Sequence, residues 1–297
     1  MAAVPESAVL SDTKAQTKAQ SEVWAGIARS YSAFSSPLVP CSEDIATVER
    51  EVARHAGMRT TQSLRAVILG VTPGLALMRW PQGSKILAAE ISPAVIEALW
   101  PGDVAGVREA ICASWFALPV DRGSCDVVLG DGSLATCRFP GEVRNLVRAV
   151  RRLLADNGIF IFRSYIQLPV QESLDEVFGA LFSQAGLTVD RFKMRLFLAM
   201  QHSSSDGMAV REAAHVLDRY HLDSRAMRER LGWSDAAIQP FSAWRTSSSI
   251  YSFPTLDELR EVLRVAFEEV SVTYPGYELG NCCPTMVMRA KKMEGTP

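Results

Sequence analysis

The stretch that decides the fold is Arg65-Ala-Val-Ile-Leu-Gly70, followed by Val71-Thr-Pro-Gly74 and by a second apolar run, Lys85-Ile-Leu-Ala-Ala-Glu90. Each run is short and almost wholly apolar, a pattern typical of a strand that is buried on both faces of a sheet. Ser92-Pro93 supplies a helix N-cap followed by proline at the first helical position, so we expect a helix after the second strand. The stretch therefore predicts strands that alternate with helices.

The same alternation continues toward the middle of the chain. Further apolar runs follow at residues 107–112, 125–130 and 159–162. A helix with one apolar face is predicted before the last run, and Asn157-Gly158 is expected to end it. Two late strands, at 267–274 and 284–290, are joined by a turn rich in proline and glycine, which favours an antiparallel return. We therefore predict an α/β fold with a doubly wound, seven-stranded and mostly parallel sheet.

The chain divides into a core, a lid and a cap. The alternation stops after Pro169 and resumes at the capping box Thr255-Leu-Asp-Glu258. Between these points apolar residues at helical spacing predict helices at 173–182 and 210–220, whereas 232–252 is expected to be a loop. The predicted divisions are a disordered tail (1–20), a helical N-terminal lid (21–60, with helices at 21–31 and 42–57), a core (61–167 and 253–292) and a mainly helical substrate cap (168–252).

Composition and charge limit the classes of partner. The 31 basic and 33 acidic residues leave a net charge of -2, which argues against nucleic-acid binding through bulk positive charge. No apolar run approaches the roughly 18 residues of a membrane-spanning helix, and the first residues lack the apolar core of a secretory signal. The 6 cysteines show no C-x-x-C spacing, and His215 and His221 are not spaced like a helical metal pair. We therefore expect a cytoplasmic protein without a metal, a membrane partner or a nucleic-acid partner.

A glycine or a polar residue stands at or just after the end of four of the predicted strands. The carboxyl ends of parallel strands form the ligand crevice of an open sheet, so Gly70, Glu90, Ser114 and Asp131 should share one edge. A glycine turn lets a ligand approach backbone N–H groups, and an acid about twenty residues later can accept both hydroxyls of a ribose. This spacing predicts a nucleoside ligand. The turn lacks G-x-G-x-x-G, so an NAD-linked dehydrogenase is the weaker alternative. Glu90 is also placed to cap the following helix, and Asp131 to bond its own turn.

Five segments, in this order, resemble the class I S-adenosylmethionine-dependent methyltransferases of the small-molecule type. They are the glycine loop Ile68-Leu-Gly-Val-Thr-Pro-Gly74, the acid in Ala89-Glu-Ile-Ser-Pro93, the segment Ala113-Ser-Trp-Phe-Ala-Leu-Pro119, the strand Cys125-Asp-Val-Val-Leu-Gly-Asp131 and the helix end Leu153-Leu-Ala-Asp-Asn-Gly158. The resemblance covers roughly residues 65–166 and 254–291.

This resemblance implies a Rossmann-like methyltransferase fold and S-adenosylmethionine as the cofactor. It places the glycine turn at the methionine part of the donor, Glu90 on the ribose, and Ser114 with Trp115 at the adenine. Asp131 is then expected near the methionine end or the acceptor, and Tyr31 is expected to close over the donor. The implied donor-binding residues are Tyr31, Gly70, Thr72, Pro73, Gly74, Glu90, Ile91, Ser114, Trp115, Asp131 and Gly132.

The implied reaction is transfer of a methyl group to a small metabolite or natural product by in-line displacement, driven largely by positioning. The candidate acceptor contacts are Arg163, Tyr165, Trp244 and Arg245. The sequence identifies no catalytic residue; Tyr165 and His215 are the candidates for a base. Asp131-Gly-Ser-Leu134 lacks the Asn/Asp-Pro-Pro-aromatic signature of amino methylation of nucleobases and protein amides, which favours other acceptors. A homodimer is compatible with the sequence.

Two other functions stay open at this point. An aminopropyl transferase uses a related nucleoside donor but needs an acidic pocket, and the cap has few clustered acids. The second function is that of a non-catalytic module, which binds S-adenosylmethionine and acts through a protein partner. It stays open because Trp233, Phe241 and Trp244 could form a partner surface.

Two patterns receive a structural interpretation. Arg144, Arg148, Arg151 and Arg152 follow helical spacing and are interpreted as a solvated helix face. Cys282-Cys283 precedes a predicted buried strand and is interpreted as a pair of buried thiols.

Overall fold

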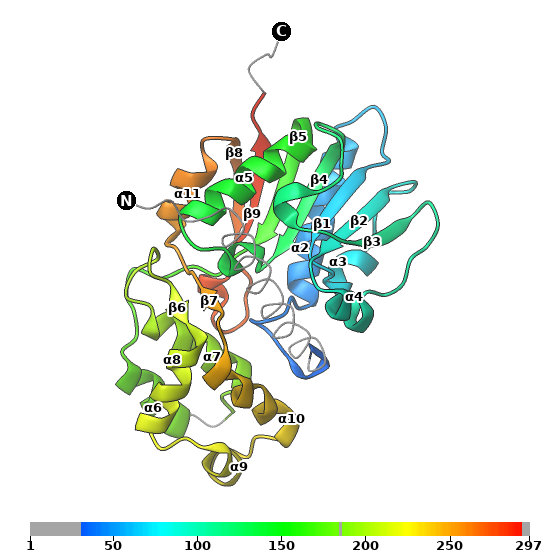
Figure 1. Ribbon diagram of the computed structural model, residues 1–297. Coiled ribbons are helices and arrows are strands. Elements are labelled where there is room, and N and C mark those ends of the chain that lie inside the picture. The colour runs from blue at the N-terminus through cyan, green and yellow to red at the C-terminus, as the bar shows by residue number, and fades with distance from the viewer. Residues whose placement is uncertain (1–30, 184–185, 293–297) are drawn as a thin grey trace, which may run out of the picture.

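The computed structural model describes residues 31–183 and 186–292 (Figure 1). The predicted tail at 1–20, and all of the predicted helix at 21–31 except its last residue, lie outside the described residues. The main sheet has the strand order β3-β2-β1-β4-β5-β9-β8. Its strands are β1 (Arg65–Leu69), β2 (Lys85–Glu90), β3 (Arg108–Cys112), β4 (Cys125–Asp131), β5 (Leu154–Arg163), β8 (Phe267–Thr273) and β9 (Thr285–Ala290).

The first five strands pair in parallel, and β9 runs antiparallel to both of its neighbours, β5 and β8. The predicted doubly wound, seven-stranded and mostly parallel sheet is therefore confirmed. A switch point lies between β1 and β4, because the chain builds β2 and β3 on one side of β1 and the later strands on the other. In open α/β sheets the ligand crevice forms at such a point, beyond the carboxyl ends of the strands.

Helices cover both faces of the sheet (Figure 1). On β1, Ile68 faces the layer formed by α2, α3 and α4, whereas Val67 and Leu69 face the layer that contains α5 and α11. Side chains alternate across a strand, so burial on both faces explains why residues 66–69 of β1 are all apolar. The helices are α2 (Ser42–Gly57), α3 (Pro73–Leu77), α4 (Pro93–Leu99), α5 (Gly141–Leu153) and α11 (Leu256–Leu263).

A helical cap occupies the chain between β5 and α11. It lies beside the sheet at the end where the parallel strands finish (Figure 1). Hydrogen bonds join its return to the core: Gln201 Nε2 donates to the Phe253 carbonyl at 2.7 Å, and Ser252 N donates to the Ala135 carbonyl at 2.9 Å. Its elements are α6 (Leu174–Ser183), α7 (Val189–Met200), β6 (Met208–Ala209), α8 (Val210–Arg219), α9 (Ser224–Leu231), α10 (Asp235–Ile238), the 3-10 helix η4 (Gln239–Thr246) and β7 (Ile250–Tyr251).

Several local predictions are corrected. The segment 232–252 is not a loop, because it holds α10, η4 and β7, and α7 was not predicted at all. Asn157 has a φ of 66° within β5 and does not end a helix; α5 already ends at Leu153. At the start of α2 the N-cap is Cys41, whose N–H donates to Asp44 Oδ2 at 2.9 Å, and Ser42 is the first helical residue.

Two general properties bear on the kind of protein. None of the described helices combines the length and the apolarity needed to cross a bilayer. Within the described part of the chain, histidine, cysteine and acidic side chains form no group of three that could hold a metal ion, and all 6 cysteines are free.

Candidate active site

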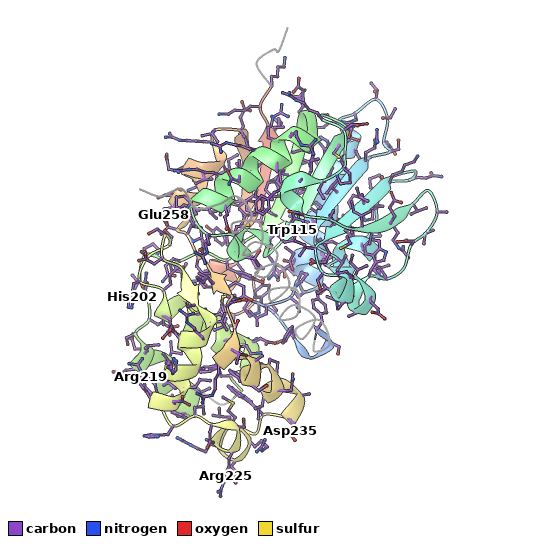
Figure 2. All side chains as sticks on the ribbon, in the orientation of Figure 1. Trp115, His202, Arg219, Arg225, Asp235 and Glu258 are labelled. Carbon is purple, nitrogen blue, oxygen red and sulfur yellow. The ribbon has the colours of Figure 1, made fainter. Side chains whose placement is uncertain are left out.

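The candidate site is the edge of the sheet where β1 to β5 end, which we call the strand edge. At its centre the Ala89 carbonyl accepts two hydrogen bonds, from Gly70 N at 2.8 Å and from the Trp115 indole Nε1 at 2.7 Å. Gly70 has a φ of +96°, a conformation that favours glycine. These bonds hold the turns after β1, β2 and β3 together, and Trp115 lies at the end of the sheet that faces the cap (Figure 2).

Glu90 ends β2 and is half-buried, and burial raises the pKa of its carboxyl group. Its Oε1 accepts a hydrogen bond from Ser92 N at 2.9 Å, so this carboxylate does cap the start of α4. Capping through one oxygen is compatible with a second role for the other. Contact between Glu90 and a ribose stays a prediction.

Apolar surface accompanies these polar groups. Ile91, directly after β2, is 38% exposed, and Phe116 in the 3-10 helix η2 (Trp115–Ala117) after β3 is 45% exposed. The Ser114 hydroxyl oxygen accepts a hydrogen bond from Phe116 N at 3.4 Å. Sequence reasoning missed Phe116, although its place beside Trp115 was a usable signal. Exposed apolar side chains beside a hydroxyl suit a planar, polar-edged base such as adenine.

A buried ion cluster lies where β4 and β5 end. Asp131 and Arg163 are paired in register, and Arg163 Nε donates to Asp131 Oδ1 at 2.6 Å. Asp44 of α2 is the second carboxylate, with its Oδ2 at 3.9 Å from Arg163 Nη1. The side chains of Asp44 and Arg163 are each 3% exposed, and that of Asp131 is 9% exposed. The Tyr277 hydroxyl accepts from Arg163 Nη1 at 3.1 Å and contacts Asp44 Oδ1 at 3.3 Å.

The covering segment, residues 31–40, is bonded to both the sheet and the cap. Arg163 Nη1 donates to the Pro37 carbonyl at 2.7 Å, and the Tyr165 hydroxyl donates to the Leu38 carbonyl at 3.0 Å. On the cap side, the Ser35 N–H and hydroxyl donate to Asp190 Oδ2 of α7 at 2.6 and 3.0 Å. The covering segment therefore crosses between the strand edge and the cap.

Tyr31 begins the covering segment and lies half-buried near Asp131. Burial, reinforced by the Asp131 charge, raises the pKa of Tyr31 to about 12. The structure therefore brings Tyr31 to the strand edge, as predicted, with its phenol protonated at neutral pH. Its contact with the donor stays a prediction.

The glycine turn also packs against α2. Thr72 is the N-cap of α3 and Pro73 its first residue. A Cβ atom at Gly74 would lie 2.9 Å from Ile45 Cδ1, so the Ile45 side chain of α2 would have to shift to admit a larger residue there. Beyond the turn, a space of about 10 Å³ lies between α2 and the ion cluster, bordered by Leu75 among others. That volume is at the lower limit of the space that one water molecule needs. Gly132, after β4, has a φ of +63°.

The structure does not bring the residues predicted for the acceptor and for a base together at an open site, so these roles stay predictions. Arg163 and Tyr165 are buried and engaged with the ion cluster and the covering segment, so they are not open to an acceptor. Burial raises the pKa of Tyr165 well above its usual range, which disfavours the phenolate form. Trp244 is buried in the cap, 5.1 Å from Phe197 between ring centroids. Arg245 is exposed and paired with Asp218.

His215, the other candidate base, is exposed on α8 and belongs to the cap rather than to the strand edge. Its neighbours along α8, Ala214 and Val216, are buried, so the imidazole lies on the outer face of that helix. The structure therefore does not place His215 at the strand edge, and its role as a base stays a prediction. The physical reason is the orientation of α8, which the spacing of apolar residues does not fix relative to the sheet.

Four residues around the covering segment were missed: Asp44, Tyr277, Asp190 and Lys193. Lys193 is 4% exposed, with its Nζ 3.4 Å from Asp190 Oδ1 and 4.9 Å from the centroid of the Phe34 ring. Burial lowers the pKa of Lys193 despite this ion pair. No local pattern distinguishes these residues, because their partners are far away in the chain.

Comparison with known proteins adds to this geometry. Residues 68–162 match the family described as the methyltransferase domain. A search of curated proteins found no match. A solved structure from Rhodobacter sphaeroides, named as a proposed Zn-dependent alcohol dehydrogenase, is 15% identical, covers 92% of this chain and 99% of that chain, and has a TM-score of 0.57. At this identity the likeness concerns the fold alone.

Two further structures are named as methyltransferases. The 1,6-didemethyltoxoflavin-N1-methyltransferase of Burkholderia thailandensis, with bound S-adenosylhomocysteine, is 13% identical, with a TM-score of 0.45 and coverage of 98% of this chain and 92% of that chain. The N-methyltransferase NodS of Bradyrhizobium japonicum, with the same ligand, is 8% identical, with a TM-score of 0.44 and coverage of 86% of this chain and 92% of that chain.

The sheet order and the family match define a class I methyltransferase fold. Residues 68–162 therefore form a methyltransferase domain, whose cofactor is S-adenosylmethionine. The residues at the strand edge fit this donor: Glu90 offers a carboxylate for the ribose, and the Ile91 and Phe116 side chains offer apolar surface for the adenine. The Asp131 carboxylate is already paired with Arg163, so its predicted contact with the donor stays a prediction.

Proposed function

We propose that the protein transfers the methyl group of S-adenosylmethionine to a small molecule by in-line displacement. The observation that carries this proposal is the covering segment, which is hydrogen-bonded to β5 through Arg163 and to α7 through Asp190. A site covered in this way excludes water and admits an acceptor small enough to be enclosed. A protein or nucleic-acid acceptor would need an open strand edge.

The groups near the ion cluster favour an acceptor that is already nucleophilic. The pKa values of Tyr31, Tyr165 and Tyr277 are all raised, chiefly by burial, so their phenols hold their protons at neutral pH. Asp131 and Asp44 are turned toward Arg163. The chain then contributes by binding the donor, orienting the acceptor and excluding water, and positioning supplies much of the rate. Suitable acceptors carry an amine, a thiolate, or an oxygen or carbon that ionises readily.

The same cluster makes aminopropyl transfer the weaker alternative. A polyamine acceptor needs carboxylates with uncompensated charge, whereas the Arg163 guanidinium lies between Asp131 and Asp44 at this edge. Decarboxylated donor should therefore give no aminopropyl product with putrescine or spermidine.

The test of the proposed function uses donor labelled in its methyl group and an extract from the source cells. After incubation with the purified protein, the extract is separated into a low-molecular-weight fraction and a macromolecular fraction. The label should enter the low-molecular-weight fraction, and Glu90→Ala protein should transfer much less of it. Label found only in protein or nucleic acid would refute the small-molecule proposal while leaving donor binding intact.

Two expectations about setting follow. We propose the cytoplasm as the location, because all 6 cysteines are free thiols and a reducing compartment keeps them so. Cell fractionation checks this. The homodimer stays a prediction, and sedimentation of the purified protein decides it.

A further inference from the structure

A second concave site lies away from the strand edge, along the outer side of α5. It is a groove of about 560 Å³ that is lined by residues of α5 and of the chain that leads from α11 into β8. Five guanidinium groups border it, next to exposed Val265: Arg122, Arg144, Arg148, Arg151 and Arg152. We call it the arginine groove. Its volume lies in the range of small-molecule sites.

Two of these arginines, Arg151 and Arg152, stabilise the fold through hydrogen bonds. Arg151 Nε donates to the Lys291 carbonyl at 2.8 Å, and its Nη2 pairs with Asp156 Oδ1 at 2.8 Å. Arg152 donates to the Leu118 and Val120 carbonyls, at 2.9 Å each. Both lie in the last turn of α5, where the helix dipole favours a positive charge. Fold stability therefore accounts for their presence.

Stability does not account for Arg144 and Arg148. Both are exposed, and they lie one helical turn apart, where like charges repel each other. Arg148 donates only to the neutral Asn145 Oδ1, at 3.2 Å. Across residues 31–183 and 186–292, no carboxylate forms an ion pair with Arg144, Arg148 or Arg152. The protein has a net charge of -2, so this positive charge is concentrated locally.

We propose that the arginine groove binds a phosphorylated small molecule that carries at least two phosphate groups. Guanidinium groups bind phosphate oxygens through paired N–H donors, and several of them around one concave site suit more than one phosphate. Val265 is 69% exposed at the rim and offers an apolar contact to the organic part of such a ligand. A groove of this size, on a protein of slightly negative charge, favours a small ligand over a nucleic acid.

The test is calorimetric titration of the full chain with inorganic tripolyphosphate. We expect saturable binding that weakens as salt is added. The Arg144→Ala/Arg148→Ala double variant should bind at least about tenfold more weakly, because two charge-assisted contacts are lost. The matched control is Arg219→Ala/Arg225→Ala, which removes the same charge from the cap, far from the groove (Figure 2). Its affinity should stay within about twofold of the unchanged protein.

Three outcomes would overturn the proposal. One is the absence of saturable tripolyphosphate binding. Another is equal weakening in both double variants, which would indicate a general effect of charge. The third is a short RNA that binds the groove more tightly than tripolyphosphate and loses affinity in Arg144→Ala/Arg148→Ala, which would make the partner a nucleic acid. Titration of each variant with S-adenosylmethionine, whose site lies at the strand edge, checks that the protein is folded.

Discussion

Replacement of Arg163 by methionine tests how the protein is held together at the strand edge. Methionine keeps much of the apolar length of arginine but removes the guanidinium group. The change therefore leaves Asp131 and Asp44 without the cation that lies 2.6 and 3.9 Å from them. It also removes the donor to the Pro37 carbonyl, and with it a bond that fixes the covering segment.

The size of the effect follows from burial. The Arg163 side chain is 3% exposed, and loss of one partner from such a buried ion pair typically costs about 3–5 kcal/mol, because the remaining charge is left desolvated and unpaired. The matched control is Arg260→Met. Arg260 also faces two carboxylates, Glu269 at 2.8 Å and Asp257 at 3.2 Å, but its side chain is 42% exposed. Loss of an exposed pair costs about 1 kcal/mol or less.

The assay is urea unfolding of the wild-type protein and both variants at neutral pH, followed by tryptophan fluorescence and by circular dichroism. Arg163→Met should lower the free energy of unfolding by about 3–5 kcal/mol, and Arg260→Met by no more than about 1 kcal/mol. Equal losses of unfolding free energy in the two variants would refute the reasoning, because it attributes the difference between them to the burial of Arg163. A loss below about 1 kcal/mol for Arg163→Met would refute it as well.

Three further predictions concern single residues. Glu90→Ala should weaken binding of S-adenosylmethionine about tenfold or more in calorimetry, and unchanged affinity would remove Glu90 from the donor site. Burial lowers the pKa of His55, so folding keeps its imidazole neutral, whereas the unfolded chain takes up a proton below about pH 6.5. The free energy of unfolding of the wild-type protein should therefore fall as the pH falls below that value, by at most about 1.4 kcal/mol per pH unit. The stability of His55→Gln should fall less over the same pH range. Gly132→Ala should lower the melting temperature more than Gly232→Ala does. Both glycines have a left-handed φ, but only at 132 would the new Cβ lie 3.0 Å from Tyr165 Cε2. Equal effects of the two changes would contradict that contact.

The core was predictable because its signals are local. The interior residues of β1 and β2, 66–69 and 86–89, are all apolar, since both faces of these strands are covered. The capping box at Thr255 is present as predicted, with Glu258 Oε2 accepting from Thr255 N at 2.7 Å. Parallel pairing then follows from the helical crossovers, which bring Gly70 and Asp131 to one edge without further information.

The cap was less predictable because its signals are mixed. Along α7 the buried residues include Asp190 and Lys193 as well as Phe192 and Leu196, so the helix shows no clean apolar stripe. Polar residues become buried there because they pair with each other and with Ser35. No period in the sequence reports such pairs.

For Arg163, the sequence predicted the position of the side chain but not its contacts. The end of β5 was correctly expected at the strand edge, yet the guanidinium group binds the covering segment rather than an acceptor. Its partner, the Pro37 carbonyl, lies 126 residues earlier in the chain. Every residue has a backbone carbonyl, so the sequence does not show which one Arg163 will bind. The same holds for Asp190, which is 155 residues from its partner Ser35. Sequence reasoning therefore reaches the residues that a strand end presents, but not the groups that a distant segment brings to them.

This separation matters for how the two substrates are selected. The donor-side residues, such as Gly70 and Glu90, occupy strand ends and are fixed by the sheet itself. On the proposed function the covering segment closes the acceptor side, and its position depends on long-range bonds from Arg163 and Asp190. A change in the covering segment can therefore alter which acceptor is enclosed while the residues expected to hold the donor keep their places. If the proposed function holds, one sheet edge supports a constant donor and a variable acceptor, because the sheet positions the residues expected to hold the donor and long-range bonds position the covering segment.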